Sequence, residues 1–216
     1  MNAAAEFNAC LAQCPLVAII RGVTPDEVES IGETLYAAGF RIIEVPLNSP
    51  DPLRSIERLA KRIGEEAIIG AGTVLRPQDV RQIADAGGRI IVSPSTDAEV
   101  IRATVEAGLV SCPGYFTPSE AFVALGAGAH ALKLFPAEGA SPAVVKAQRA
   151  VIPRDTPLLA VGGIRPDGMK PWLDAGANGF GLGSALYRPG STAAEVAANA
   201  RAFVDTWQQI EAERPL

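Results

Sequence analysis

Residues 86–113 read AGGRIIVSPSTDAEVIRATVEAGLVSCP, and this stretch decides the fold. It holds an apolar run, a helical pattern and a second apolar run, and each apolar run follows an Ala-Gly pair. Glycine just past the end of a helix supplies the left-handed cap that turns the chain toward a strand. The stretch therefore predicts one strand, one helix and a second strand in succession.

The same unit recurs along the chain. The Ala-Gly pairs that precede apolar runs are Ala38-Gly39, Ala86-Gly87, Ala107-Gly108, Ala127-Gly128 and Ala175-Gly176. The runs are nearly continuous in hydrophobicity and bounded by Gly or Pro, as is typical of parallel strands buried on both faces. The strands predicted in this way are Leu16–Ile20, Arg41–Val45, Ala67–Gly70, Arg89–Val92, Leu109–Pro113, Ala131–Phe135, Leu158–Val161 and Gly179–Leu182.

Helical patterns separate these strands, and several begin with proline behind a capping residue. Such starts are Thr24-Pro25-Asp26-Glu27, Ser49-Pro50, Arg76-Pro77, Thr117-Pro118-Ser119-Glu120, Ser141-Pro142 and Arg165-Pro166. Repeated strand–helix units predict an α/β fold, a (β/α)8 TIM barrel with an additional N-terminal helix at about residues 3–13 and a last helix at about 193–211. We expect residues 1–216 to form a single barrel domain. A doubly wound open sheet is the alternative, which the even spacing and the lack of a dinucleotide fingerprint disfavour.

Composition limits the function classes. The chain has 216 residues, is 48% hydrophobic and 20% charged, and carries a net charge of -5. It lacks the general basic field that binds nucleic acid or an anionic membrane, so neither is an expected partner. No apolar stretch reaches the length of about 18 residues that a membrane span needs. The N-terminus lacks a basic region followed by an apolar core, so we expect no signal peptide and a cytoplasmic protein.

The cysteines and the single histidine do not indicate a metal site. Cys10, Cys14 and Cys112 are odd in number and show no repeated spacing, which argues against a disulfide framework. We expect them to be small buried hydrophobic residues. His130 has no second histidine to complete a metal site or a triad, so we expect a structural residue at the bottom of the barrel.

Two charged residues interrupt apolar runs. Lys133 stands within ALKLFP (131–136), where its amine is desolvated unless it has a partner or loses its proton. A lysine with a lowered pKa is a nucleophile for carbonyl carbon, although a lysine at a strand end can also extend to water. Glu44 ends the run RIIEV (41–45). A salt bridge to Arg21 or Lys133 is one interpretation, and acid/base catalysis is the other.

Polar and glycine residues gather at the predicted carboxyl ends of the strands, where barrel enzymes hold their chemistry. In chain order these ends carry Arg21-Gly22, Glu44, Gly72-Thr73, Ser93-Pro94, Pro113-Gly114, Lys133 with Phe135, Gly162-Gly163 and Gly183-Ser184. Barrels commonly hold phosphate after strands seven and eight, through backbone amides. The last two glycine segments therefore predict a phosphate site, with tight loop packing as the alternative.

Six motifs together resemble a known family. IIRGVTPDE (19–27), EVPLNSP (44–50), IGAGTV (69–74), ALKLFPA (131–137), AVGGI (160–164) and GLGSALY (181–187) are similar in order and spacing to the class I aldolases that cleave 2-keto-3-deoxy-6-phospho sugar acids. The resemblance spans about Leu16 to Tyr187. It implies a (β/α)8 barrel, a homotrimer, a Schiff base on a lysine without cofactor or metal, and the products pyruvate and glyceraldehyde 3-phosphate.

The resemblance also implies roles for residues. Lys133 matches the Schiff-base lysine and Glu44 the acid/base glutamate. Thr73 and Arg21 match contacts to the substrate carboxylate or hydroxyls, and Pro94 and Phe135 complete the expected substrate-binding set. The phosphate site is matched by Gly162, Gly163, Gly183 and Ser184.

The chain departs from the gluconate-type members of the family at two positions. Asn48 stands where those members have arginine, and Val161 stands where they have threonine; the galactonate-type members resemble this chain at both. The two substrates differ in configuration at C4, and buried polar groups discriminate strongly. We therefore expect 2-dehydro-3-deoxy-6-phosphogalactonate as substrate, with the gluconate epimer as the alternative. A sugar-phosphate isomerase or epimerase and a non-catalytic sugar-phosphate sensor are the alternatives from other classes.

Overall fold

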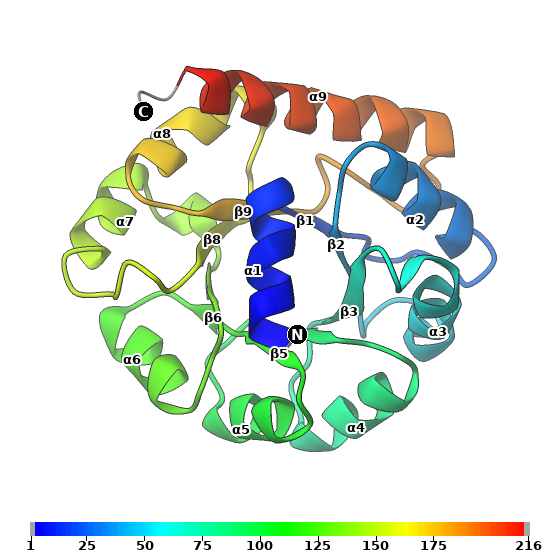
Figure 1. Cartoon of the computed structure of the whole chain (residues 1–216), viewed down its shortest axis with the longest axis horizontal. Coiled ribbons are helices and arrows are strands. Elements are labelled where there is room, and N and C mark those ends of the chain that lie inside the picture. Colours follow the sequence, from blue (N-terminus) through cyan, green and yellow to red (C-terminus); the bar gives the residue numbers. More distant parts are fainter. Residues whose placement is uncertain (1–2, 214–216) are drawn as a thin grey trace.

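The fold is a closed barrel of parallel strands surrounded by helices (Figure 1). A computed structural model describes residues 3–213, in which nine strands form one sheet in the order β5-β4-β3-β2-β1-β9-β8-β7-β6. Every pairing between neighbouring strands is parallel. The predicted (β/α)8 barrel is confirmed and the doubly wound alternative is wrong. The predicted domain limits, residues 1 and 216, lie outside the described residues.

The strands and helices alternate along the chain. The strands are β1 Leu16–Ile19, β2 Ile42–Pro46, β3 Ile68–Gly72, β4 Ile90–Val92, β5 Val110–Cys112, β6 Gly114–Tyr115, β7 Leu132–Leu134, β8 Leu158–Val161 and β9 Gly179–Leu182. The α-helices are α1 Ala3–Gln13, α2 Val28–Ala37, α3 Pro52–Ile63, α4 Pro77–Asp85, α5 Ala98–Glu106, α6 Pro118–Gly126, α7 Pro142–Gln148, α8 Met169–Asp174 and α9 Ala193–Ala212. Two 3-10 helices, η1 Ala137–Gly139 and η2 Pro166–Gly168, precede α7 and α8.

The fifth predicted strand closes the barrel as two short pieces. β5 and β6 flank Pro113, which has no backbone N–H to continue the ladder. On one side β5 pairs with β4, and on the other β6 pairs with β7. The carbonyl of Ser111 in β5 also accepts hydrogen bonds from the backbone N–H groups of His130 (2.9 Å) and Ala131 (3.2 Å). The two pieces therefore act as one strand of an eight-stranded barrel.

The capping glycines behave as predicted. All five glycines of the Ala-Gly pairs have positive φ: Gly39 (111°), Gly87 (85°), Gly108 (75°), Gly128 (99°) and Gly176 (106°). Side chains other than glycine rarely adopt this conformation, so these positions turn each helix toward the next strand.

One predicted helix start is wrong, and a second is preceded by a turn: the N–H of Val28 already donates to the carbonyl of Thr24 (3.1 Å). α3 begins at Pro52 rather than at Ser49-Pro50, because the Ser49 hydroxyl accepts a hydrogen bond from the N–H of Gly22 (2.9 Å) and holds this loop against the end of β1. The chain then turns through Asp51, which has a left-handed φ of 40°. α2 begins at Val28, after a turn in which the Glu27 carboxylate accepts from the N–H of Thr24.

Helix α1 covers the amino-terminal end of the barrel and crosses it in Figure 1. Its buried residues Phe7, Cys10 and Leu11 pack against the side chains that fill the barrel interior. The Arg89 guanidinium, at the start of β4, pairs with Glu6 of α1 and donates to two backbone carbonyls. Apolar packing and an ion pair therefore close this end, and a ligand must enter at the other.

Cys10, Cys14 and Cys112 are buried and unbridged, as predicted. His130 lies at the amino-terminal end of β7, where its Nδ1 accepts from the N–H of Ser111 (3.0 Å), which confirms a structural contact.

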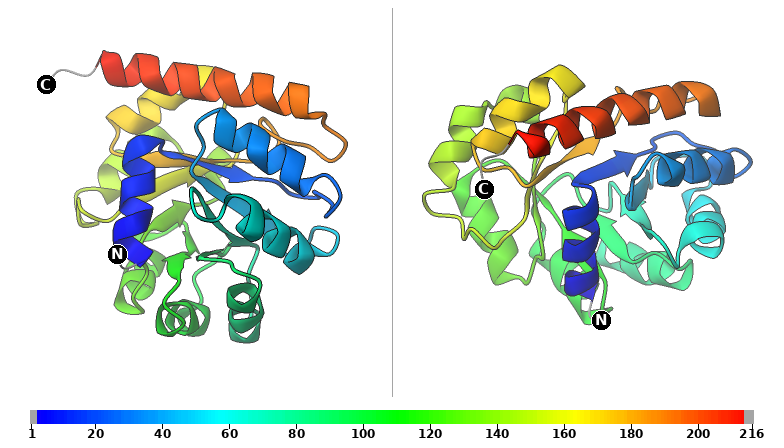
Figure 2. Two further views of the ribbon diagram at one scale, coloured as in Figure 1. Left: turned by 45° about the vertical axis from the view of Figure 1, so that its right-hand side comes forward. Right: turned by 45° about the horizontal axis from the view of Figure 1, so that its top comes forward.

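Helix α9 runs along the outside of the barrel beside α2 and α8 (Figure 2). Within residues 3–213, no helix is long and apolar enough to cross a membrane.

Candidate active site

Lys133 lies inside the barrel on β7. The residue is 6% exposed, and its Nζ lies 4.7 Å from the centre of the Phe135 ring. Burial lowers the pKa of the Lys133 amine, which the nearby Glu44 carboxylate partly opposes. The aromatic face stabilises the charged amine only weakly. Desolvation therefore prevails, and the neutral form of the amine is more accessible than in water. The predicted buried lysine is confirmed as a feature of the fold.

Glu44 lies on β2 and is 2% exposed. Burial raises the pKa of its carboxyl to about 7, although Lys133 and Arg21 lower it in part. Its Oε2 is buried and has no hydrogen-bond partner among the described residues. A buried acid with an unused oxygen and a pKa near neutrality can both accept and release a proton.

Glu44 and Lys133 line one small cavity of about 10 Å3 at the centre of the barrel. Cys112 lines it too, and burial raises the pKa of its thiol to about 12, so the thiol stays neutral. The remaining lining is apolar, including Val17 and Val92. The two ionisable groups therefore influence each other in surroundings that water does not screen well.

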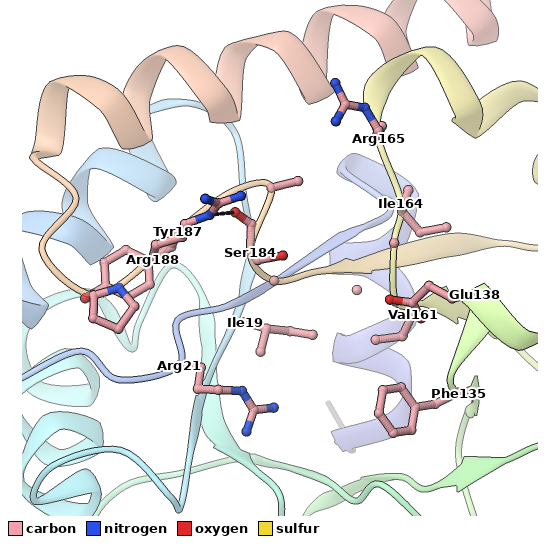
Figure 3. Close-up of a pocket in the computed structure, with 16 residues that line it drawn as sticks. Ile19, Arg21, Phe135, Glu138, Val161, Ile164, Arg165, Ser184, Tyr187 and Arg188 are labelled. Atoms are coloured by element: carbon pink, nitrogen blue, oxygen red, sulfur yellow. Dashed lines mark hydrogen bonds between the residues drawn. The ribbon is translucent and has the colours of Figure 1, made fainter.

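A larger pocket of about 480 Å3, drawn in Figure 3, adjoins this cavity. The two share Ile19, Val161 and Gly181 in their linings. Its walls also carry Arg21, Phe135, Gly162, Gly163, Gly183 and Ser184 of the predicted site. The structure thus brings the predicted phosphate residues together with Arg21 and Phe135, beside the cavity that holds Lys133 and Glu44. Thr73 and Pro94 follow β3 and β4 at the same end of the barrel but do not line this pocket.

Arg21 points into the pocket from the end of β1 (Figure 3). Its Nη1 donates to the Oδ1 of Asn48 at 2.9 Å. Asn48 therefore orients the guanidinium and leaves its other nitrogens for an anionic ligand. Across the pocket, Val161 presents an apolar wall.

Thr73 has a left-handed backbone with φ of 58°. This conformation is strained for a β-branched residue, and such strain is concentrated at functional sites. Thr73 follows Gly72, whose α-carbon lies against the Glu44 carboxyl. The strain is thus located beside the buried acid.

The glycines predicted to bind phosphate are of two kinds. Gly162 and Gly163 have positive φ (114° and 65°), and a Cβ at Gly162 would lie 2.0 Å from the Oε2 of Glu138. The backbone conformation therefore favours glycine at these two positions, with the Glu138 side chain packed against both. Gly183 differs, because a Cβ there would meet nothing within 4 Å. Open space beside Gly183 indicates room for a ligand.

Sequence reasoning missed several residues that line this pocket. Glu138, Arg165, Tyr187 and Arg188 all belong to loops and short elements rather than to apolar strands. Their surroundings in the sequence are short and rich in Ala, Gly and Pro, and they gave no periodic signal. The sole indication for Arg188 is its place directly after the motif GLGSALY.

The donor set also bears on metal binding. Within the described part of the chain, no group of three His, Cys, Asp or Glu side chains lies close enough together to hold a metal ion. The site offers a buried amine, a buried carboxyl and an anion-binding rim instead.

Fold and site together define a barrel enzyme that acts on a small anionic carbonyl compound. Residues 7–206 match the aldolase family described as KDPG and KHG aldolase. The chain is 46% identical over 195 residues to 2-dehydro-3-deoxy-6-phosphogalactonate aldolase of Escherichia coli (strain K12), covering 90% of this chain and 95% of the relative. It is 45% identical over 196 residues to a probable 2-dehydro-3-deoxy-6-phosphogalactonate aldolase of Rhizobium meliloti (strain 1021), covering 91% and 92%.

A solved structure described as native KDPGal superposes with a TM-score of 0.91 at 45% identity, covering 93% of this chain and 97% of that one. The chain therefore belongs to the KDPG and KHG aldolase family. The resemblance inferred from the six sequence motifs is confirmed.

Proposed function

We propose that this protein is a class I aldolase that cleaves 2-dehydro-3-deoxy-6-phosphogalactonate to pyruvate and D-glyceraldehyde 3-phosphate. One observation carries the proposal: Lys133 and Glu44 share a buried cavity that adjoins an arginine-bearing pocket. The galactonate relatives at 45–46% identity support this substrate.

The reaction begins at the Lys133 amine. Its pKa is lowered by burial, so more of it is neutral and able to attack the C2 ketone of the substrate. The resulting carbinolamine loses water to give a protonated imine. Glu44, directly or through a water molecule, supplies the proton that converts the leaving hydroxyl to water.

Cleavage follows from the imine. The Glu44 carboxylate removes the proton of the C4 hydroxyl, the C3–C4 bond breaks, and its electron pair moves to the imine nitrogen. Glyceraldehyde 3-phosphate leaves, and an enamine of pyruvate remains on Lys133. Protonation at C3 and hydrolysis release pyruvate and the free amine. No step requires a metal or an organic cofactor, because the protonated imine accepts the electron pair.

The remaining site residues hold the substrate along the pocket. Arg21, oriented by Asn48, binds the C1 carboxylate, and Phe135 lies beside the reacting carbons. Thr73 and Pro94 contribute from the neighbouring strand ends, outside the walls of the pocket. The phosphate lies at the loops after β8 and β9, against Gly162, Gly163, Gly183 and Ser184. Binding energy from this distant group orients the C3–C4 bond for cleavage.

Val161 and Asn48 support the choice of the galactonate epimer. Both line or adjoin the substrate pocket, where the gluconate-type members have a threonine hydroxyl and a second arginine. Without a hydroxyl at 161, one configuration of the C4 hydroxyl loses its partner, and an unpaired buried hydroxyl is strongly disfavoured.

The proposal extends to the assembly and the cellular location of the protein. We propose a single-domain subunit that assembles as a homotrimer and acts in the cytoplasm. Val105 of α5 and Phe122 and Val123 of α6 are exposed apolar side chains that a subunit contact would cover. Sedimentation equilibrium measures the assembly directly, and a monomer at micromolar concentration would contradict it.

Borohydride trapping tests the covalent mechanism. Reduction in the presence of pyruvate is expected to add a stable pyruvyl mass at Lys133, and Lys133→Met, which removes the amine at similar length, is expected to show neither adduct nor turnover. A coupled lactate dehydrogenase assay separates the aldolase from an isomerase, because only the aldolase releases pyruvate. Comparing kcat/KM on the two C4 epimers tests the substrate, and preference for the gluconate epimer would reverse that assignment alone.

A further inference from the structure

We propose that Arg188 binds the C6 phosphate of the substrate. The proposal rests on the proposed function for the identity of the ligand. It adds a charged side chain to a phosphate site otherwise made of backbone amides and the Ser184 hydroxyl.

The loop after β9 fixes the Arg188 backbone. The Ser191 N–H donates to the carbonyl of Arg188 (2.9 Å), and the Arg188 N–H donates to the Ser191 hydroxyl (3.2 Å). The ring of Pro189 lies against Gly22, where a Cβ would stand 2.6 Å from its Cγ. The turn is therefore closed on itself and packed against the loop that follows β1.

A second contact fixes the side chain. The Nε of Arg188 donates to the carbonyl of Ser184 at 3.0 Å, a contact visible in Figure 3. This bond holds the guanidinium beside the residue already predicted to bind phosphate. Within residues 3–213, nothing accepts a hydrogen bond from its two terminal nitrogens. Those nitrogens form a planar pair that suits two phosphate oxygens.

Binding a phosphate dianion in this pocket requires a positively charged side chain such as Arg188. The chain carries a net charge of -5, and the same pocket wall holds the Glu138 carboxylate, which repels a phosphate dianion. A local cation is needed to offset both. Arg21 lies at the end of β1 and is occupied in part by Asn48. Arg188 is the arginine held beside Ser184. The neighbouring Gly183 faces open space, since a Cβ at that position would meet nothing within 4 Å.

Arg165 provides a comparison within the same pocket. It follows β8 and lines the pocket, but in Figure 3 its guanidinium points away from the cavity. Its Nε lies 3.9 Å from the Asp167 carboxylate. Both arginines are exposed and carry one charge each. Comparing their variants therefore distinguishes a direct contact with phosphate from an effect of the total charge of the pocket.

The test compares two substrates, the 6-phospho keto-deoxy acid and its counterpart without phosphate. Arg188→Ala is expected to raise KM for the phosphorylated substrate about ten-fold, the value of one charged hydrogen bond, with kcat little changed. Both constants for the counterpart without phosphate should stay unchanged. Arg188→Lys should restore part of the loss, and Arg201→Ala, on exposed α9, should match the wild type.

Inorganic phosphate as an inhibitor and as a ligand in calorimetry gives a second measurement. Its dissociation constant is expected to rise by a similar factor in Arg188→Ala. Three results would overturn the proposal: no change in either measurement, an equal loss on both substrates, or an equal loss from Arg165→Ala. If the wild type released no pyruvate from the phosphorylated acid, the proposed function would fail, and the calorimetric measurement would still decide the role of Arg188.

Discussion

The carboxyl group of Glu44 lies against the α-carbon of Gly72. A Cβ built at position 72 would stand 1.9 Å from Oε2, and its three nearest heavy atoms all belong to the Glu44 carboxyl. The residues come from adjacent strands, β2 and β3. The missing side chain at 72 therefore creates the space in which the buried acid is held.

Gly72→Ala should consequently disable the enzyme without removing a catalytic group. Gly72 ends β3, so alanine fits its backbone, but the new methyl group displaces the carboxyl. We expect kcat to fall by at least about 100-fold, as when a general acid/base is lost. Overpacking should cost about 1–3 kcal/mol of unfolding free energy, measured by urea denaturation.

The double variant Gly72→Ala/Glu44→Ala is the control. Removing the carboxyl removes the clash, so in that background Gly72→Ala should change the stability little. A cost equal to that in the wild type would show that the alanine clashes with something other than Glu44.

Glu44→Gln should make the stability less dependent on pH. Burial raises the pKa of Glu44 from 4.5 to about 7, so the folded state retains a proton that the unfolded state releases. This stabilisation is complete below about pH 4.5 and is lost as the pH rises to about 7. Glutamine carries no charge to desolvate. The free energy of unfolding of the variant, relative to that of the wild type, should therefore rise by about 3 kcal/mol at most between these pH values.

Urea denaturation of both proteins at pH 5 and pH 8 measures this difference. The stability of Glu44→Gln relative to wild type should be greater at pH 8 than at pH 5, while its kcat is lower by about 100-fold or more. A constant difference between the two pH values would contradict a raised pKa.

The strands, the helix ends and the two buried charges could be predicted because each depends on residues that are neighbours in the sequence. The capping glycines require a positive φ, and buried parallel strands require continuous apolar runs, so both appear in the order of residues. Lys133 and Glu44 were recognisable because each puts a charge in such a run. Their roles followed from the family motifs rather than from the runs.

The residues that were missed depend on how loops close in space. Glu138 reaches Gly162 from the 3-10 helix after β7, and Arg188 reaches Ser184 within the loop after β9. Both stand in short segments rich in Ala, Gly, Ser and Pro, where the periodicity of hydrophobic residues carries no information. The wrong start of α3 has the same origin, because the bond between Gly22 and Ser49 joins loops that are distant in the sequence.

Thr73→Gly should raise stability while lowering activity. The left-handed backbone of Thr73, with φ of 58°, is strained for threonine and relaxed for glycine. Relief of this strain stabilises the folded state, whereas the greater freedom of glycine stabilises the unfolded chain. The net gain in unfolding free energy should be about 1 kcal/mol. Thermal unfolding and kcat/KM check the two effects, and a loss of stability would show that the threonine side chain makes contacts that outweigh its strain.

Gly183→Ala and Gly162→Ala separate a glycine needed by a ligand from one needed by the fold. At 183 an added methyl group meets nothing, so the stability should change by less than about 0.5 kcal/mol. The methyl group would enter the space assigned to phosphate, so KM should rise about ten-fold or more for the phosphorylated substrate and little for its counterpart without phosphate. At 162 the positive φ of 114° and the Glu138 carboxylate should make alanine cost about 1–3 kcal/mol. Urea denaturation and steady-state kinetics on both variants distinguish them, and an equal rise of KM on both substrates in Gly183→Ala would place the phosphate elsewhere.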